Sequence, residues 1–284
     1  MHGGHGPVGV ANEPERFDAQ APGFDRRAGL PAHAARAVAR AVLEIAAPGP
    51  DDLLVELGAG TGEIGRHLIE SICYVGIDRS EAMLELFREK LASDDDARVR
   101  LSRTDANRRW PVGDNSAKVV FASRVGHLLD AEHLLAELQR VCRPEGYFLV
   151  GRVIRDPDGL KSRLRRQRIL LLRRQGVAPR DAEEATERAL GGLVACGAVR
   201  IQPRRVTTWT ARASVREILD AWGVVGAMGG KQLGAATRAR VLPEVESWAA
   251  CELGDLDEVA AWEERYVLEG VRMPGDRRST CRVG

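Results

Sequence analysis

Apolar residues recur along residues 30–155 in two alternating patterns, one typical of helices and one of buried strands. Residues 30–47 place Val38, Val42 and Ile45 at helical spacing. The next apolar run, LLVEL at 53–57, is short and bounded by turn residues, which is typical of a buried strand. The alternation continues with helices predicted at 62–71, 80–93 and 131–142 and strands at 74–78, 118–123 and 146–154. This order predicts βαβ units and a mostly parallel sheet with helices on both faces.

The pattern changes after Ile154, where the chain becomes richer in charge. Residues 156–195 predict a helical lid insertion, because Leu160, Leu164 and Leu171 keep helical spacing. Residues 196–284 predict the remaining strands with a helical insertion, and RYVLEGVRM at 265–273 is a candidate final strand. Pro203 marks the strand-like run 198–211 as an edge or a bend. We expect one elaborated α/β domain, with 1–16 as a disordered tail and 17–155 as an N-terminal cap plus the core.

The composition is that of an ordinary globular protein, with 44% hydrophobic and 29% charged residues among 284. The formal net charge of +1 gives no overall field that would attract nucleic acid or a membrane. The five cysteines form no CxxC pair, so we expect no metal site and no disulfide framework. We also see no apolar run long enough to cross a membrane, and expect a cytoplasmic protein.

Three glycines, Gly58, Gly60 and Gly62, lie between the strand at 53–57 and the next helix. Glycine tolerates a positive φ and lets a ligand lie against bare backbone amides. Asp78 ends the next strand, twenty residues after Gly58, where a carboxylate can accept both hydroxyls of a ribose. The pattern predicts a site for a nucleoside-bearing cofactor.

Two cofactor classes fit a glycine loop of this kind. A dinucleotide site needs GxGxxG, but its third glycine position is Glu63 here, and an acid would repel a pyrophosphate. S-adenosyl-L-methionine (SAM) has no phosphate and carries cationic sulfonium and ammonium groups, so Glu63 and Glu56 favour it. A nicotinamide enzyme is therefore the weakest hypothesis.

The segment VELGAGTG at 55–62 resembles motif I of the class I SAM-dependent methyltransferases. GIDRSEAMLE at 76–85 is similar to the family's second-strand segment, and LQRVCRPEGYFLVG at 138–151 to its helix–Pro–Gly–strand segment. FDAQAPGFDRRAGLP at 17–31 is similar to the cap of the small-molecule branch that includes the ubiquinone/menaquinone and biotin-pathway methyltransferases. The resemblance spans roughly 17–155. It implies a Rossmann-like sheet of seven mostly parallel strands, the last antiparallel, with helical cap and lid insertions.

The resemblance also implies roles for individual residues. Asp78 would bind the ribose, Met83 would pack on the adenine, and Asp105 would meet the adenine amino group. The full set of implied cofactor-binding residues is Glu56, Gly58, Ala59, Gly60, Thr61, Gly62, Asp78, Arg79, Met83, Asp105, Ala106 and Ser123. Phe17 or Phe24 would close over the site from the cap. The alternatives are structural: Asp78 as a cap, Asp105 as a solvated loop acid, and Glu56 as a tie between cap and sheet.

Methyl transfer from SAM is an in-line displacement, so the protein mainly aligns the acceptor and a base is optional. His127, just after the strand at 118–123, is the candidate catalytic base; its alternative role is structural. Arg124 is a candidate anchor for a substrate carboxylate, or alternatively an ion-pair partner for the cap.

Residues 152–174 contain nine Lys or Arg against two Asp. Such a helix is typical of a lid that recruits an anionic substrate, an acidic carrier protein or lipid. It is equally typical of a polar surface helix whose charge is offset by Glu183, Glu184 and Glu187. A second basic run at 98–109 leaves RNA as an option, although the net charge disfavours nucleic acid as a partner.

The sequence therefore predicts a SAM-dependent methyltransferase that acts on a small molecule and releases S-adenosyl-L-homocysteine (SAH). The alternatives are an RNA or protein methyltransferase, and a SAM-binding protein that transfers no methyl group.

Overall fold

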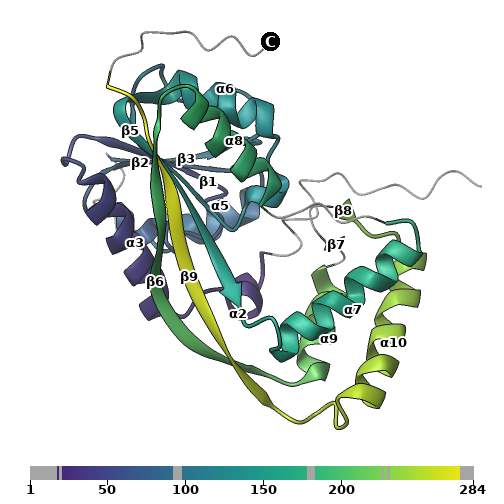
Figure 1. Ribbon diagram of the computed structural model, residues 1–284. Helices are drawn as coiled ribbons and strands as arrows, with labels where there is room; N and C mark the ends of the chain where they lie inside the picture. Colours follow the sequence, from purple (N-terminus) through teal and green to yellow (C-terminus); the bar gives the residue numbers. More distant parts are fainter. Residues whose placement is uncertain are drawn as a thin grey trace, which may run out of the picture.

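The computed structural model describes residue 18 and residues 21–91, 98–177, 183–225, 227–228 and 231–275. Seven strands form one sheet in the order β3–β2–β1–β4–β5–β9–β6 (Figure 1). Their bounds are β1 Leu53–Leu57, β2 Cys73–Asp78, β3 Val99–Arg103, β4 Ala117–Ser123, β5 Cys142–Arg155, β6 Val199–Ala213 and β9 Ala260–Arg272. β1 to β5 pair in parallel, and β9 runs antiparallel between β5 and β6. The predicted Rossmann-like sheet with an antiparallel last strand is confirmed.

Pro203 lies in β6, which is the edge strand of this sheet. The pairing of β6 with β9 shifts register between Ile201 and Arg204, so the residue without an N–H falls at an irregularity in the ladder. The predicted edge or bend at Pro203 is therefore confirmed.

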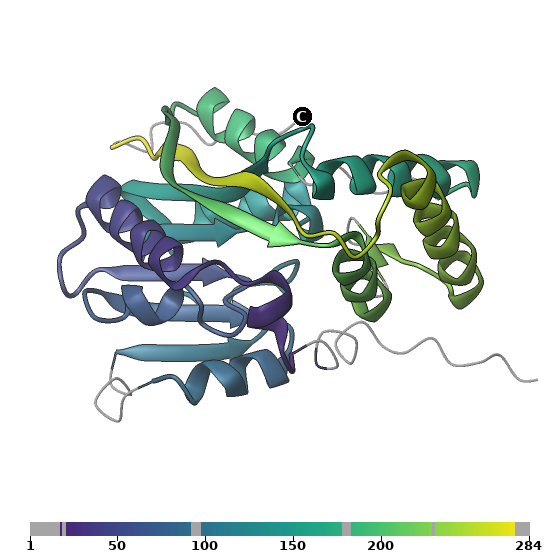
Figure 2. The ribbon, with the colours of Figure 1, turned by 90° about the horizontal axis from the view of Figure 1, so that it is seen from below.

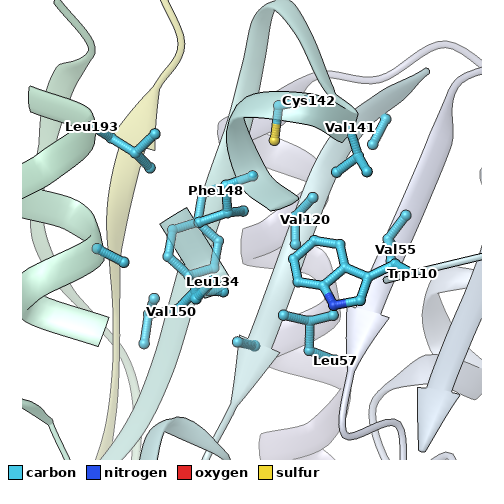
Figure 3. Packing of buried hydrophobic residues seen from close by; sticks show 14 of the residues in the cluster. Val55, Leu57, Trp110, Val120, Leu134, Val141, Cys142, Phe148, Val150 and Leu193 are labelled. Carbon is cyan, nitrogen blue, oxygen red and sulfur yellow. The ribbon is translucent and has the colours of Figure 1, made fainter. Parts of the chain in front are cut away.

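Two hydrophobic cores lie on the two faces of the sheet. One face is covered by α3 (Ala32–Ala46), the short helix α4 (Gly65–Leu68) and α5 (Glu81–Arg88), through residues such as Val42, Leu68 and Phe87. The other face is covered by α6 (Ala131–Val141) and α8 (Glu184–Ala195), with Trp110 and Phe148 at its centre (Figure 3). The sheet is thus buried on both sides, which explains why its central strands read as unbroken apolar runs.

A third core belongs to a separate group of helices, which we call the helical lobe. It consists of α7 (Leu160–Arg174), α9 (Val215–Val225) and α10 (Ala235–Glu252), packed through Leu164, Ile218 and Val245. The lobe extends from the ends of β5 and β6 and lies beyond the sheet in both views (Figures 1 and 2). The small hairpin of β7 (Ala227–Met228) and β8 (Lys231–Gln232) follows α9.

The predicted lid over residues 156–195 is wrong for its second half. α7 belongs to the helical lobe, but α8 packs against the sheet, where Ala189, Leu190 and Leu193 join the core beside α6. α8 packs on the sheet because it has an apolar face. The charged residues at the start of the segment led the sequence analysis to assign the whole segment to a lid. The helical insertion predicted within 196–284 is present as α9 and α10, and the predicted tail at 1–16 lies outside the described residues.

Candidate active site

A crevice of about 1380 Å³ lies at the carboxyl ends of the parallel strands, between the sheet, the N-terminal segment and the helical lobe. The carboxyl edge is where open α/β sheets bind ligands, because the strand-to-helix loops end there. Its sheet side includes Gly58 and Gly60 after β1, Asp78 at the end of β2 and Ser123 at the end of β4. These four predicted site residues therefore line one crevice.

The three loop glycines all have positive φ, at 68°, 54° and 73° for Gly58, Gly60 and Gly62. A Cβ on Gly62 would lie 2.1 Å from Phe87 Cδ2, and one on Gly58 would lie 2.9 Å from Val125 Cγ2. A Cβ on Gly60 would instead have 3.9 Å to its nearest neighbour, the Gly58 carbonyl oxygen. Packing therefore requires Gly58 and Gly62, whereas Gly60 is the position at which the loop faces open space.

Asp78 ties this loop to the second strand. Its carboxylate accepts hydrogen bonds from the backbone N–H of Gly60 at 2.8 Å and of Ser80 at 2.9 Å. Burial raises the pKa of Asp78 even though these backbone hydrogen bonds act in the opposite direction. Each oxygen accepts one of these bonds and keeps capacity for another, so Asp78 can hold the loop and still accept a ligand hydroxyl.

Asp105 lies in the same crevice, on the loop after β3. Arg79 donates to its Oδ2 at 3.0 Å, and the Asn107 N–H donates to its Oδ1 at 2.9 Å. A third of the Asp105 side chain is exposed. The carboxylate is therefore fixed in direction and accessible from the crevice.

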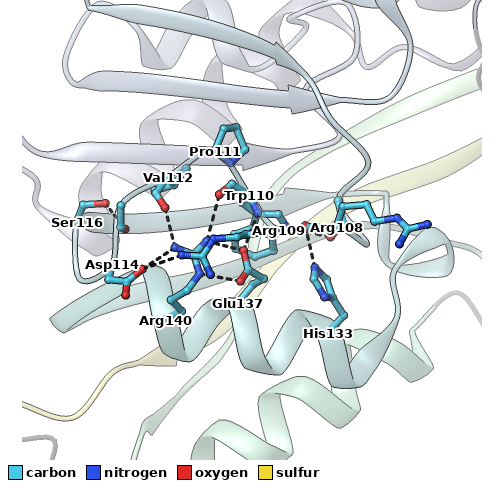
Figure 4. Close-up of polar contacts among 12 residues, drawn as sticks. Arg108, Arg109, Trp110, Pro111, Val112, Asp114, Ser116, His133, Glu137 and Arg140 are labelled. Atoms are coloured by element: carbon cyan, nitrogen blue, oxygen red, sulfur yellow. Dashed lines mark hydrogen bonds and ion pairs between the residues drawn. The ribbon is translucent and has the colours of Figure 1, made fainter.

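An ion pair on α6 between the buried Glu137 and the half-buried Arg140 holds the loop after β3 in place (Figure 4). Arg140 pairs with Glu137 at 2.6 Å, and the Trp110 N–H donates to the same Glu137 carboxylate at 2.7 Å. Burial would raise the pKa of Glu137, but the hydrogen bonds from Arg140 and Trp110 outweigh it and the pKa is lowered. The loop is thus anchored from beneath by a charge-assisted network.

The N-terminal segment is fastened across the crevice by acids that sequence reasoning missed. Asp25, in the short helix α2 (Phe24–Ala28), accepts from Thr61 Oγ1 at 2.5 Å and from Lys90 at 2.7 Å. Asp18 accepts from Ser80 Oγ at 2.5 Å. No spacing rule would single out these contacts, because their partners lie 36 to 65 residues away. Phe24 lines the crevice as expected, and Phe17 lies outside the described residues.

Arg124 and Glu63 belong to the same closure. Arg124 has a left-handed φ of 57°, and its guanidinium donates to the Ala28 carbonyl oxygen at 2.5 Å and to Glu63. Glu63 also accepts from the Leu30 N–H. This supports the ion-pair alternative for Arg124 over the substrate anchor. It also corrects the argument that the charge of Glu63 favours a cationic cofactor. Arg124 neutralises that charge, and the Glu63 carboxylate binds the N-terminal segment through the Leu30 N–H.

Glu56 is 3% exposed and lies beneath the glycine loop. Its Oε2 accepts a 2.5 Å hydrogen bond from the Tyr74 hydroxyl, so it links β1 to β2 rather than to the N-terminal segment. Burial raises its pKa to about 8. Glu56 still contributes to the crevice lining, as do Ala59, Thr61, Met83 and Ala106.

The remaining lining comes from β4, from the loop that follows it and from the lobe. Ser123 Oγ lies 2.7 Å from the Tyr266 hydroxyl of β9. His127 is half-buried in the single turn Gly126–Leu128 and lines the crevice. Three tryptophans that sequence reasoning did not place also line it: Trp209, Trp222 and Trp262.

Residues 54–146 match the family model of a methyltransferase domain. This match and the sheet order support a class I SAM-dependent methyltransferase. Together with the sheet order, the match confirms the predicted class and, at that level, SAM as its methyl donor, whereas the branch within the class stays a prediction.

Relatives of this methyltransferase domain have diverse sequences. Phosphoethanolamine N-methyltransferase 2 of Caenorhabditis elegans is 31% identical over 104 residues, which cover 36% of this chain and 24% of that protein. A methyltransferase candidate from Bacillus halodurans C-125 has a TM-score of 0.56 at 13% identity, with 83% of this chain and 98% of that chain covered. The Haemonchus contortus phosphoethanolamine N-methyltransferase 2 has a TM-score of 0.52 at 16% identity, with 95% and 61% covered. These likenesses at low identity show the shared fold.

Two further observations concern the described residues alone. No helix in the described ranges is long and apolar enough to cross a membrane. No group of three or more His, Cys, Asp and Glu side chains within them could hold a metal ion.

Proposed function

We propose that this chain is a methyltransferase (EC 2.1.1.-) that transfers the SAM methyl group to a small molecule held in the crevice. The observation that carries the proposal is the convergence of Gly60, Asp78 and Asp105 on one continuous crevice. The first offers open backbone, and the two acids offer fixed acceptor oxygens.

Each of these acceptors would bind a different group of the cofactor. The ribose hydroxyls would donate to the remaining acceptor capacity of Asp78, and the adenine amino group would donate to Asp105. Met83 and Ala106 would pack against the adenine, since both line the crevice near these acids. The N-terminal segment would exclude water through the contacts of Asp25 and Glu63.

The residues of this chain would contribute alignment above all. Holding the acceptor atom in line with the sulfonium methyl can supply about 7–11 kcal/mol of the barrier reduction. His127 is the side chain we propose as a base for an acceptor with a high pKa, and its structural role in the Gly126–Leu128 turn is the alternative.

A small acceptor fits the shape of the crevice. Its volume of about 1380 Å³ exceeds the usual ligand-pocket range of about 300–1,000 Å³, which leaves room for SAM and a second molecule. Trp209 of β6, Trp222 of α9 and Trp262 of β9 add apolar surface to the lining. Four described cysteines are free thiols, which fits our placement of the protein in the cytoplasm.

The RNA alternative receives little support from the second basic run. Arg98 donates to the Pro50 carbonyl oxygen at 2.9 Å, and Arg109 lies 3.6 Å from Asp114. These side chains are thus engaged with neighbouring loops rather than gathered as a free basic face.

The test is incubation of the full chain with methyl-labelled SAM and, separately, a metabolite extract, total RNA and total protein. Label in the metabolite fraction together with SAH release supports the proposal. Label in RNA or protein would favour those alternatives. Absence of SAH release in all three would favour a SAM-binding protein without transfer.

A further inference from the structure

We propose that the acceptor carries an oxyanion group, a phosphate or a carboxylate, which binds Lys161, Arg165 and Arg212 on the lobe side of the crevice. This inference rests on the proposed function and names the class of its acceptor.

The basic side chains come from two elements. Lys161, Arg165 and Arg168 are spaced four and three residues apart on α7, which places them on one face of the helix. All three line the crevice, and Arg212 joins them from β6. The crevice lining therefore includes these four cationic side chains.

Arg152 and Arg155, two other cations of the crevice, already have acidic partners. Arg155 pairs with Glu264 at 2.7 Å, and Arg152 pairs with Glu269 and Glu183. Glu217, a further acid of the lining, accepts from the Ser214 N–H at 2.8 Å. The acids of the crevice are thus engaged elsewhere.

Within the described residues, Lys161, Arg165 and Arg212 form no ion pair with an acid. Lys161 is half-buried, and burial lowers its pKa. Arg168 is buried with its guanidinium 4.8 Å from the centre of the Trp222 ring, and burial lowers its pKa to about 10. Arg165 and Arg212 are exposed, whereas burial removes part of the hydration of Lys161 and Arg168. An oxyanion bound among them would be stabilised by charge-assisted hydrogen bonds.

The outer face of the same helix provides the matched contrast. Arg163, Arg166 and Arg173 line a separate groove beside Trp248, away from the crevice. The arginine-rich composition of α7 therefore divides into two faces, and the proposal concerns the inner one alone.

The experiment is calorimetry on the full chain saturated with SAH, titrated with inorganic pyrophosphate and, in a second series, with acetate. We expect pyrophosphate to bind with a Kd below about 1 mM. The double variant Lys161→Gln/Arg165→Gln should weaken it at least tenfold, and Arg163→Gln should stay within twofold. SAH affinity, measured first on each variant, reports that the fold is retained. Acetate binding of similar strength would assign the site to carboxylates, and pyrophosphate binding alone to phosphates.

Two results would overturn the inference. One is the absence of binding by both anions at about 10 mM; the other is an equal loss in Arg163→Gln, which would show general attraction to a basic helix. If SAH itself fails to bind, the proposed function fails, and the anion titrations on the free protein still decide whether this cluster is an oxyanion site.

Discussion

The two walls of the crevice are built in opposite ways. On the sheet side, the polar groups are paired with one another. Asp78 accepts a hydrogen bond from the glycine loop, Asp105 pairs with Arg79, and Glu63 pairs with Arg124. On the lobe side, Lys161 and Arg212 line the crevice without an acidic partner among the described residues. The charged groups of the sheet wall are thus paired with one another, whereas the lobe wall has cations that form no ion pair among the described residues. A common cofactor and a variable acceptor would produce this difference.

The largest expected effect is on stability, and it comes from comparing a glycine-to-alanine substitution in the glycine loop with one just after the end of α7. Gly62→Ala should lower the free energy of unfolding by about 3 kcal/mol or more, because left-handed strain adds to a clash with Phe87. Gly176→Ala, in the lobe, has the same positive φ but open space around it, and should cost about 1 kcal/mol. Urea denaturation of both variants measures the difference. Equal losses would show that the glycine loop is not specially packed.

The raised pKa of Glu56, in the sheet wall, predicts that the stability of the protein depends on pH. The pKa of Glu56 is about 8 in the folded chain against an ordinary 4.5, so the folded state binds more protons between these values. Stability should therefore fall as pH rises from 6 to 8, by up to about 1.4 kcal/mol per pH unit. Glu56→Gln should remove much of this fall, while Glu85→Gln, at an exposed position of α5, should retain it. Parallel pH profiles for the two variants would contradict the assignment.

Asp78→Asn should weaken SAH binding at least tenfold, or about 1.4 kcal/mol, because a charged acceptor for the ribose hydroxyls is lost. The same change at Asp156, an exposed acid just before α7, should leave the affinity within twofold. Calorimetry measures both. An unchanged SAH affinity in Asp78→Asn would show that the Asp78 carboxylate does not bind the ribose.

His127→Ala should have the smallest effect on the cofactor. Its turn lies at the crevice edge after β4, so SAH affinity should remain within twofold while transfer to a hydroxyl acceptor slows. Thermal unfolding and SAH titration of the variant check this. A joint collapse of stability and affinity would assign His127 to the architecture of the turn.

The sheet wall was predictable because its chemistry follows local spacing. The glycines, Asp78 and Ser80 are fixed by strand-to-helix geometry, and Ser80 caps α5 through Met83 N as its position suggests. The resemblance to the methyltransferase family predicted the antiparallel last strand, and the lack of an N–H at Pro203 predicted the edge or bend there.

The lobe wall and the N-terminal closure depend on contacts between distant parts of the chain. Asp25 meets Lys90 65 residues away, and Trp262 reaches the crevice from β9. Local periodicity also could not distinguish the location of α7 from that of α8, because both patterns predict helices. The two helices differ only in the core they join: α7 packs in the helical lobe and α8 packs on the sheet. These features follow from packing, which a single sequence does not encode at fixed spacing.

The central claim is that SAM lies across the glycine loop, with its ribose at Asp78 and its adenine at Asp105. A crystal structure of the full chain with SAH tests it most directly. We predict both ribose hydroxyls within hydrogen-bonding distance of the Asp78 carboxylate, the adenine amino group at Asp105, and the sulfur facing the cavity lined by the helical lobe. SAH bound elsewhere, or a crevice that stays empty at saturating SAH, would contradict the account.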